Sequence, residues 1–127
     1  MSNALEHQVG GDHYKKLAIQ PVELIVNLHL DYFDGNIVKY VTRHRFKNGK
    51  EDIKKAIHYC ELAIYYSKYK NPIGTKFSFT TTAKLVDKYA EKNYLTLQER
   101  NAIYYACTDS YKLAIETLNK IIKEYEQ

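Results

Sequence analysis

The chain has few residues that interrupt regular structure. Its 127 residues include five glycines, two prolines and no tryptophan, so the frequent turns of an all-β fold are not expected. The longest apolar stretch, 24–30, contains Asn27 and His29 and is too short to span a membrane. No charged segment followed by an apolar one marks a signal peptide at the N-terminus. We therefore expect a cytoplasmic protein.

The residue patterns of most catalytic and metal sites are also absent. Cys60 and Cys107 lie in helical apolar patterns without metal-type spacing, which predicts buried thiols. The sequence has no Walker A loop, no dinucleotide fingerprint and no Gly-x-Ser-x-Gly elbow. Its carboxylates do not form the facing clusters of a helical metal site, because Glu23 stands alone and Glu51 and Asp52 are adjacent. We expect no metal and no cofactor, and the sequence identifies no catalytic residue.

Positive charge and tyrosine are the two features in excess. The net charge is +4, and segment 36–55 alone has seven Lys and Arg residues against two Asp and Glu residues. Such a local positive field favours an anionic partner. Tyrosine packs well at protein interfaces and on nucleobases, and the sequence alone does not separate these uses of the 13 tyrosines. For the tyrosines of the third helix, at positions 59, 65, 66 and 69, a subunit or domain contact is favoured over base stacking.

Apolar residues at helical spacing predict a mainly all-α fold. We expect a compact bundle of five or six helices with an irregular N-terminal segment and room for one short strand. The first helix should start at Pro21, a favoured first position, and end at Asp34-Gly35. Asn36 should cap a second helix, which runs through His44.

The second half of the chain continues the helical pattern. Region 1–71 carries the basic cluster, and we expect region 72–127 to pack on it as part of one domain. The further elements that we expect are a turn at 47–49, a third helix to about Lys70, a linker at 71–74, a short strand or extended segment around Phe77 and Phe79, a cap at Thr82, and a capping box from Thr96 to Glu99. Beyond the capping box, two helices separated at Asp109-Ser110 are slightly favoured over one long helix, because the helical period continues across this site.

The basic cluster is the strongest chemical feature. Lys39 and Arg43 are one helical turn apart and share a face. If the second and third helices form a tight hairpin, Arg43 and Lys54 approach one anion together, where Arg supplies a bidentate fork and Lys a point charge. The alternative is structural, since cations near a helix C-terminus, such as Arg43 and Lys47, also complement the helix dipole.

Two histidines have competing interpretations. His44 lies on the apolar stripe of the second helix, and a buried histidine with satisfied ring nitrogens is favoured over a catalytic one. His13 follows a glycine pair, between Asp12 and Tyr14. It either orients an imidazole toward a ligand or pins the loop to the helices, and the sequence does not separate these possibilities.

Four ordered motifs carry a family resemblance. They are Gly10-Gly11-Asp12-His13-Tyr14, Gln20-Pro21-Val22-Glu23, and the segments 35–44 and 47–56. Over residues 9–66 the chain resembles the SaV-like family of small bacteriophage proteins. The family is mostly of unknown function, and one branch, in larger proteins, is a nucleotide kinase without a Walker motif. The resemblance implies phage origin, in which case the host cytoplasm is the expected location, and a nucleotide ligand.

The motif residues are mostly polar or basic, which favours a phosphate site over packing alone. The predicted ligand-binding residues are His13, Tyr14, Lys39, Tyr40, Arg43, His44, Lys47 and Lys54. The first predicted function is capture of a nucleotide or cyclic nucleotide, such as a host defence signal. The alternatives are a nucleotide kinase or other phosphate-transfer enzyme, and a helical oligomer that inhibits a host protein. We expect a homo-oligomer that binds neither membrane nor nucleic acid.

Overall fold

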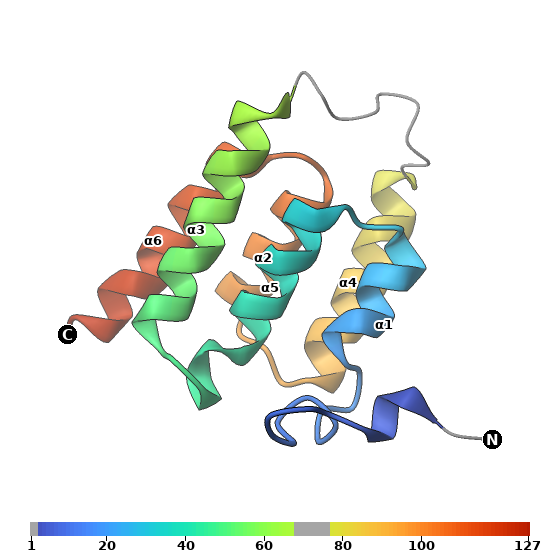
Figure 1. Ribbon diagram of the computed structural model, residues 1–127. Coiled ribbons are helices and arrows are strands. Elements are labelled where there is room, and N and C mark those ends of the chain that lie inside the picture. Colours follow the sequence, from blue (N-terminus) through green and yellow to red (C-terminus); the bar gives the residue numbers. More distant parts are fainter. Residues whose placement is uncertain (1–2, 68–76) are drawn as a thin grey trace.

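The computed structural model describes residues 3–67 and 77–127 of the chain (Figure 1). These residues form α1 (Pro21–Leu28), α2 (Tyr32–Arg43), α3 (Lys50–Tyr65), α4 (Phe79–Lys92), α5 (Leu97–Cys107) and α6 (Tyr111–Tyr125), with short 3-10 helices η1 (Ala4–Glu6) and η2 (His44–Phe46). No strand occurs within these ranges, and none of their helices has the length and apolar composition that crossing a membrane requires. The predicted all-α fold is confirmed.

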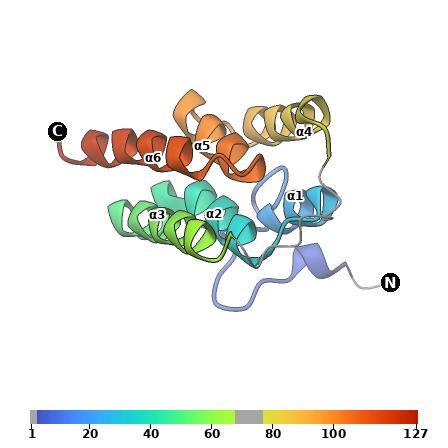
Figure 2. The same cartoon turned by 90° about the horizontal axis from the view of Figure 1, so that it is seen from above.

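The six helices form two layers. Figure 2 shows α1, α2 and α3 in one layer and α4, α5 and α6 in the other. The layers face each other in pairs, since α1 contacts α4, α2 contacts α5 and α3 contacts α6. Within the first layer, α2 and α3 form the expected antiparallel hairpin around the turn at 47–49.

The boundary between the first two helices differs from the prediction. Gln20 and Glu23 form a capping box that starts α1 at Pro21 as expected, but α1 ends at Leu28, where His29 has a left-handed conformation. The side chain of Asp31 accepts a hydrogen bond from the Asp34 amide and caps α2. Asp34-Gly35 therefore does not end a helix, and Asn36 is not a cap.

Gly35 has a packing role that explains this error. It is buried within α2, where a Cβ atom would lie 3.4 Å from the Cδ1 atom of Ile25 on α1. A Cβ atom at this distance would be at the near limit of ordinary van der Waals contact, so the contact between α1 and α2 favours a small residue here. An internal glycine of this kind resembles a helix stop in the sequence.

The described part of the C-terminal half also corrects one cap and confirms two features. Ser78 caps α4, so Phe79 is helical rather than extended and Thr82 is buried inside the helix. The capping box of Thr96 and Glu99 starts α5 as predicted. Asp109, at a φ of 60°, separates α5 from α6, which confirms two helices. The predicted linker at 71–74 and the end of the third helix near Lys70 lie outside the described residues.

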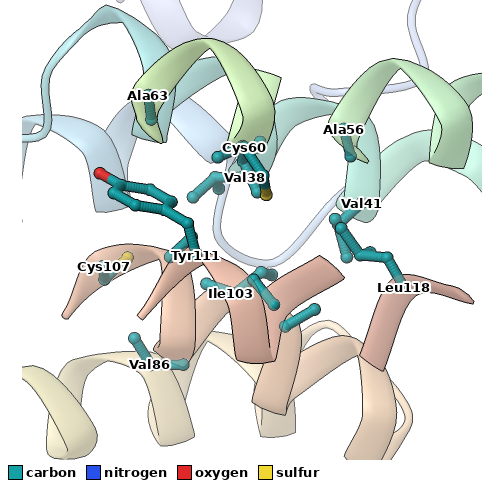
Figure 3. Packing of buried hydrophobic residues seen from close by; sticks show 14 of the residues in the cluster. Val38, Val41, Ala56, Cys60, Ala63, Val86, Ile103, Cys107, Tyr111 and Leu118 are labelled. Carbon is teal, nitrogen blue, oxygen red and sulfur yellow. The ribbon is translucent and has the colours of Figure 1, made fainter. Parts of the chain in front are cut away.

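Apolar side chains fill the space between the two layers. Figure 3 shows this packing, with Val38 and Val41 of α2 facing Ile103 of α5 and Leu118 of α6. Cys60 and Cys107 are buried in the same core, as predicted. Burial raises the pKa of the Cys60 thiol to about 12. The packed core fixes the positions of α2 and α3, whose adjacent ends carry the basic residues of segment 36–55.

Candidate functional site

Three cations surround the ring of Tyr40 on α2. The Nζ atom of Lys39 lies 4.4 Å from the ring centroid, the Cζ atom of Arg43 4.7 Å, and the Nζ atom of Lys55, on α3, 5.5 Å. We call Lys39, Tyr40, Arg43 and Lys55 the cation cluster. Among residues 3–67 and 77–127, neither lysine has a carboxylate within ion-pair distance.

Arg43, in contrast, is paired with Asp52 at the start of α3. Its Nε and Nη2 atoms donate to the two carboxylate oxygens at 3.1 Å each. The Asp52 side chain is completely buried, and that of Arg43 is 11% exposed. Burial alone would raise the pKa of Asp52, but donors from Arg43 and Asn48 hold it below the usual value. The predicted bidentate fork exists, and an internal carboxylate occupies it.

The hairpin brings a different lysine to the cluster from the one predicted. Lys54 is exposed on α3, whereas Lys55 is partly buried and reaches the Tyr40 ring. Consecutive residues of an α-helix point about 100° apart, so the two side chains leave α3 in different directions. Lys55, and not Lys54, therefore lies over the Tyr40 ring together with Lys39 and Arg43.

The N-terminal segment crosses the end of α2 and places His13 and Tyr14 beside Arg43. Gln8 holds both residues, because its Oε1 atom accepts from the Tyr14 amide at 2.7 Å and its Nε2 atom lies 3.0 Å from His13 Nδ1. The pKa of His13 is lowered by burial and by the charges of Lys47 and Arg43. Burial raises the pKa of Tyr14, and Arg43 opposes this effect. The segment thus brings two predicted residues to the cations.

His44 occupies the interior and not the cation cluster. It is 4% exposed, and its ring nitrogens contact the carboxylate of Glu99 and the hydroxyl of Tyr125. This confirms a buried histidine with satisfied nitrogens. The pKa of Glu99 stays below its usual value despite burial, because His44, the Thr96 amide and Arg45 stabilise the carboxylate. The capping pattern did not reveal that Glu99 also pairs with His44.

A pocket of about 430 Å³ lies next to the cation cluster. Most of its wall is apolar and comes from α1, the connection to α2, and the first turns of α2. Its lining includes Ile25, Leu30 and Tyr32, with Tyr14 and Lys39 also on its wall. Sequence reasoning missed the pocket, since no motif marks a cavity between helices, although the Gln20–Glu23 motif contributes to it.

The carboxylates nearest the core have structural partners. The Tyr111 hydroxyl donates to Asp34 at 2.6 Å and to Asp109 at 2.9 Å, and so connects α6 to α2. No group of three or more His, Cys, Asp or Glu residues that could hold a metal lies within the described part of the chain.

Residues 9–61 match the model of DUF3310, a family described as a protein of unknown function. The matched segment comprises residues 9–20 of the N-terminal segment, α1, α2 and most of α3. It includes every predicted site residue. No curated protein and no solved structure matches the chain. The protein is therefore all-α, and most of its first layer of helices is similar to DUF3310. The relationships to the SaV-like family and to its kinase branch stay predictions.

Proposed function

We propose that the protein binds a phosphate-bearing nucleotide, with the nucleoside in the pocket and the phosphate at the cation cluster. The observation that carries this proposal is the position of Lys39, which both lines the pocket and lies over the Tyr40 ring. The apolar cavity therefore ends at a positive charge. Binding sites for small molecules combine an apolar wall with a few placed polar groups in this way.

The two lysines of the cluster favour an anion from outside the chain. Like charges brought together on a protein surface repel each other unless a counter-charge lies nearby. Asp52 neutralises Arg43, but Lys39 and Lys55 have no such carboxylate among the described residues. A phosphate supplies both the charge and the acceptor oxygens that ammonium groups require.

Tyr14 and Arg43 act on the site indirectly in this proposal. Tyr14 lines the pocket, and its buried hydroxyl faces the guanidinium group. Arg43 holds Asp52 and supports the Tyr40 ring. These residues fix the wall against which the nucleoside packs, while Lys39 and Lys55 contact the phosphate.

The biological role that we propose is capture of a signalling nucleotide, and the SaV-like resemblance supports a phage origin and a nucleotide ligand. The kinase and the oligomeric inhibitor of a host protein stay alternative predictions. Incubation with ATP and the bound nucleotide, followed by mass spectrometry of the released ligand, separates capture from phosphate transfer. Capture returns the ligand unchanged.

The binding test uses calorimetry with mono-, di- and cyclic nucleotides against single lysine variants. A charge-assisted contact to phosphate contributes roughly 1.5–3 kcal/mol, so Lys39→Ala and Lys55→Ala should each weaken binding about ten- to a hundredfold. Lys54→Ala is the matched control, because it removes the same charge from the exposed neighbour of Lys55. Its affinity should stay within about twofold of the parent.

Two results would contradict the proposal. One is the absence of binding to any nucleotide by the folded parent. The other is an equal loss of affinity in Lys39→Ala, Lys55→Ala and Lys54→Ala, which would indicate a general effect of net charge. Melting curves for each variant check that the fold is intact. Arg43→Ala is a poor probe of ligand contact, since it also removes the partner of buried Asp52.

A further inference from the structure

A row of three tyrosines runs along the outside of α2 and α3. The rings of Tyr32 and Tyr59 meet edge to face with centroids 5.7 Å apart, and their hydroxyls lie 3.3 Å apart. The rings of Tyr59 and Tyr40 are nearly parallel, with centroids 5.9 Å apart and planes 17° apart. We call Tyr32, Tyr59 and Tyr40 the tyrosine row.

The row connects the two parts of the proposed site. Tyr32 lines the pocket at one end, and Tyr40 bears the cations at the other. Lys39 links the same two parts, because it lines the pocket and lies over Tyr40. An aromatic surface therefore extends from Tyr32 at the pocket to Tyr59 and Tyr40 outside it, and Lys39 lies next to both parts.

The side chains of the row are exposed to different degrees. Tyr32 is 68% exposed, whereas Tyr59 and Tyr40 pack against the core and keep part of their surface in solvent. A ring needed only for the core would be buried, as Tyr89 is at 0%. Exposed aromatic rings beside cations are the usual surface for stacking of nucleobases, where the rings receive the bases and the cations receive the phosphates.

We infer that the tyrosine row is a second nucleobase subsite, so that the preferred ligand is a dinucleotide. One base enters the pocket, the linking phosphate lies at Lys39, and the second base stacks on the row near Tyr59. This inference rests on the proposed function and specifies its ligand. The shared chemistry is two nucleobases joined through phosphate.

A second copy of the chain fits this surface less well. Two copies meeting through the Tyr40 end of the row about a twofold axis would bring Lys39 and Lys55 of each close to those of the other. Like charges in such a contact are unfavourable. An anionic ligand satisfies the same surface without this repulsion.

The experiment compares AMP with the linear dinucleotide pApA, and GMP with pGpG, by calorimetry on the full chain. Stacking of one base on an aromatic side chain typically accounts for a five- to hundredfold change in affinity. We expect each dinucleotide to bind about tenfold more tightly than its mononucleotide. Tyr59→Leu should remove this advantage and leave mononucleotide binding within about twofold, while Tyr59→Phe, which keeps the ring, should retain it.

Tyr104→Leu is the matched control. Tyr104 is a partly exposed tyrosine of α5 with Arg100 over its ring at 4.8 Å, so it shares the chemistry of the row but lies in the other layer. Its replacement should leave both affinities unchanged. Melting curves show whether each variant remains folded, and light scattering shows whether any of them changes its oligomeric state.

The outcomes separate this inference from the proposed function. Equal affinity for AMP and pApA, with loss of both in Lys39→Ala, overturns the second subsite and leaves nucleotide binding intact. No binding of any of the four probes overturns both. Tighter binding of a ten-residue adenylate strand than of pApA overturns the dinucleotide and identifies a single nucleic-acid strand as the ligand. A change from oligomer to monomer in Tyr59→Leu, without an effect on pApA, identifies the row as a subunit contact.

Discussion

Replacing Arg43 by alanine should destabilise the protein far more than replacing an ordinary surface arginine. The Asp52 carboxylate has no exposure, and the guanidinium group supplies two of its hydrogen bonds. Removing one partner of a buried ion pair costs about 3–5 kcal/mol, because a charge remains without compensation in a poorly solvated place. The Asn48 amide still donates to Asp52 at 3.2 Å. We therefore expect a loss at the lower end, about 3 kcal/mol at pH 7.

Arg100→Ala provides a closely matched comparison. Arg100 also lies over a tyrosine ring, at 4.8 Å from the Tyr104 centroid, and also pairs with a carboxylate, that of Asp87 at 2.6 Å. The Asp87 side chain is 59% exposed. Water can solvate Asp87 once the arginine is gone, so this variant should lose at most about 1 kcal/mol.

The pH dependence tests the same reasoning from another direction. In the parent the pKa of Asp52 is below its usual value, so the stability from this group is complete above about pH 4 and is lost as pH falls through the folded-state pKa. In Arg43→Ala, burial acts without the guanidinium and the pKa of Asp52 rises. The gap in stability between parent and variant should therefore begin to shrink as the pH falls through the raised pKa of Asp52 in the variant, and should shrink further below about pH 4, where the parent loses its own contribution.

Urea denaturation at pH 7 and pH 3.5 measures both effects, and Asp52→Asn completes a double-mutant cycle. The double variant Arg43→Ala with Asp52→Asn should lose about 1–2 kcal/mol less than the sum of the single losses, since it leaves no unpaired buried charge. A loss below about 1 kcal/mol in Arg43→Ala, unchanged between the two pH values, would refute the buried-pair argument.

Two further predictions concern the support of the site. Thr96→Ala should lower the free energy of unfolding by about 1 kcal/mol, because Thr96 accepts from the Glu99 amide at 3.1 Å; urea denaturation measures the loss, and Thr96→Ser should recover most of it. Tyr89→Phe should also lower the free energy of unfolding by about 1 kcal/mol. It removes the hydrogen bond between the buried hydroxyls of Tyr89 and Thr42, which lie 2.7 Å apart, but the Thr42 hydroxyl still donates to the Val38 carbonyl. A loss in Tyr89→Phe above about 3 kcal/mol would contradict this account.

Sequence periodicity predicted the fold because most core positions recur at helical spacing. Capping chemistry located two helix starts, at Pro21 and after Thr96, since these caps depend on residues close together in the chain. The errors at Gly35 and Thr82 have a different origin. Gly35 lies against the side chain of Ile25 on α1, and Thr82 lies on a buried face of α4. Contacts between helices determine both positions, and a local pattern does not contain them.

The candidate site was predictable as a region but not in its detail. The basic composition of 36–55 indicated the end of α2 and the start of α3, where the cation cluster lies. Choosing between Lys54 and Lys55 requires the rotation of α3 against α2, about 100° per residue. Predicting the ion pair of Arg43 with Asp52 also requires the rotation of α3 against α2. The pocket depends on how α1 leaves α2 after His29, which the sequence did not locate.

The polar character of the motifs does not by itself indicate a ligand. A motif that served packing alone would be expected to use aliphatic residues, yet the fold places Arg43 against Asp52 and His44 against Glu99 inside the protein. A buried charge needs a partner of opposite sign, so such pairs are part of how this bundle is assembled. Among the described residues, Lys39 and Lys55 over the Tyr40 ring have no carboxylate within ion-pair distance. Lysine variants therefore test the proposed nucleotide site more directly than arginine variants do, because Arg43 is already paired with Asp52.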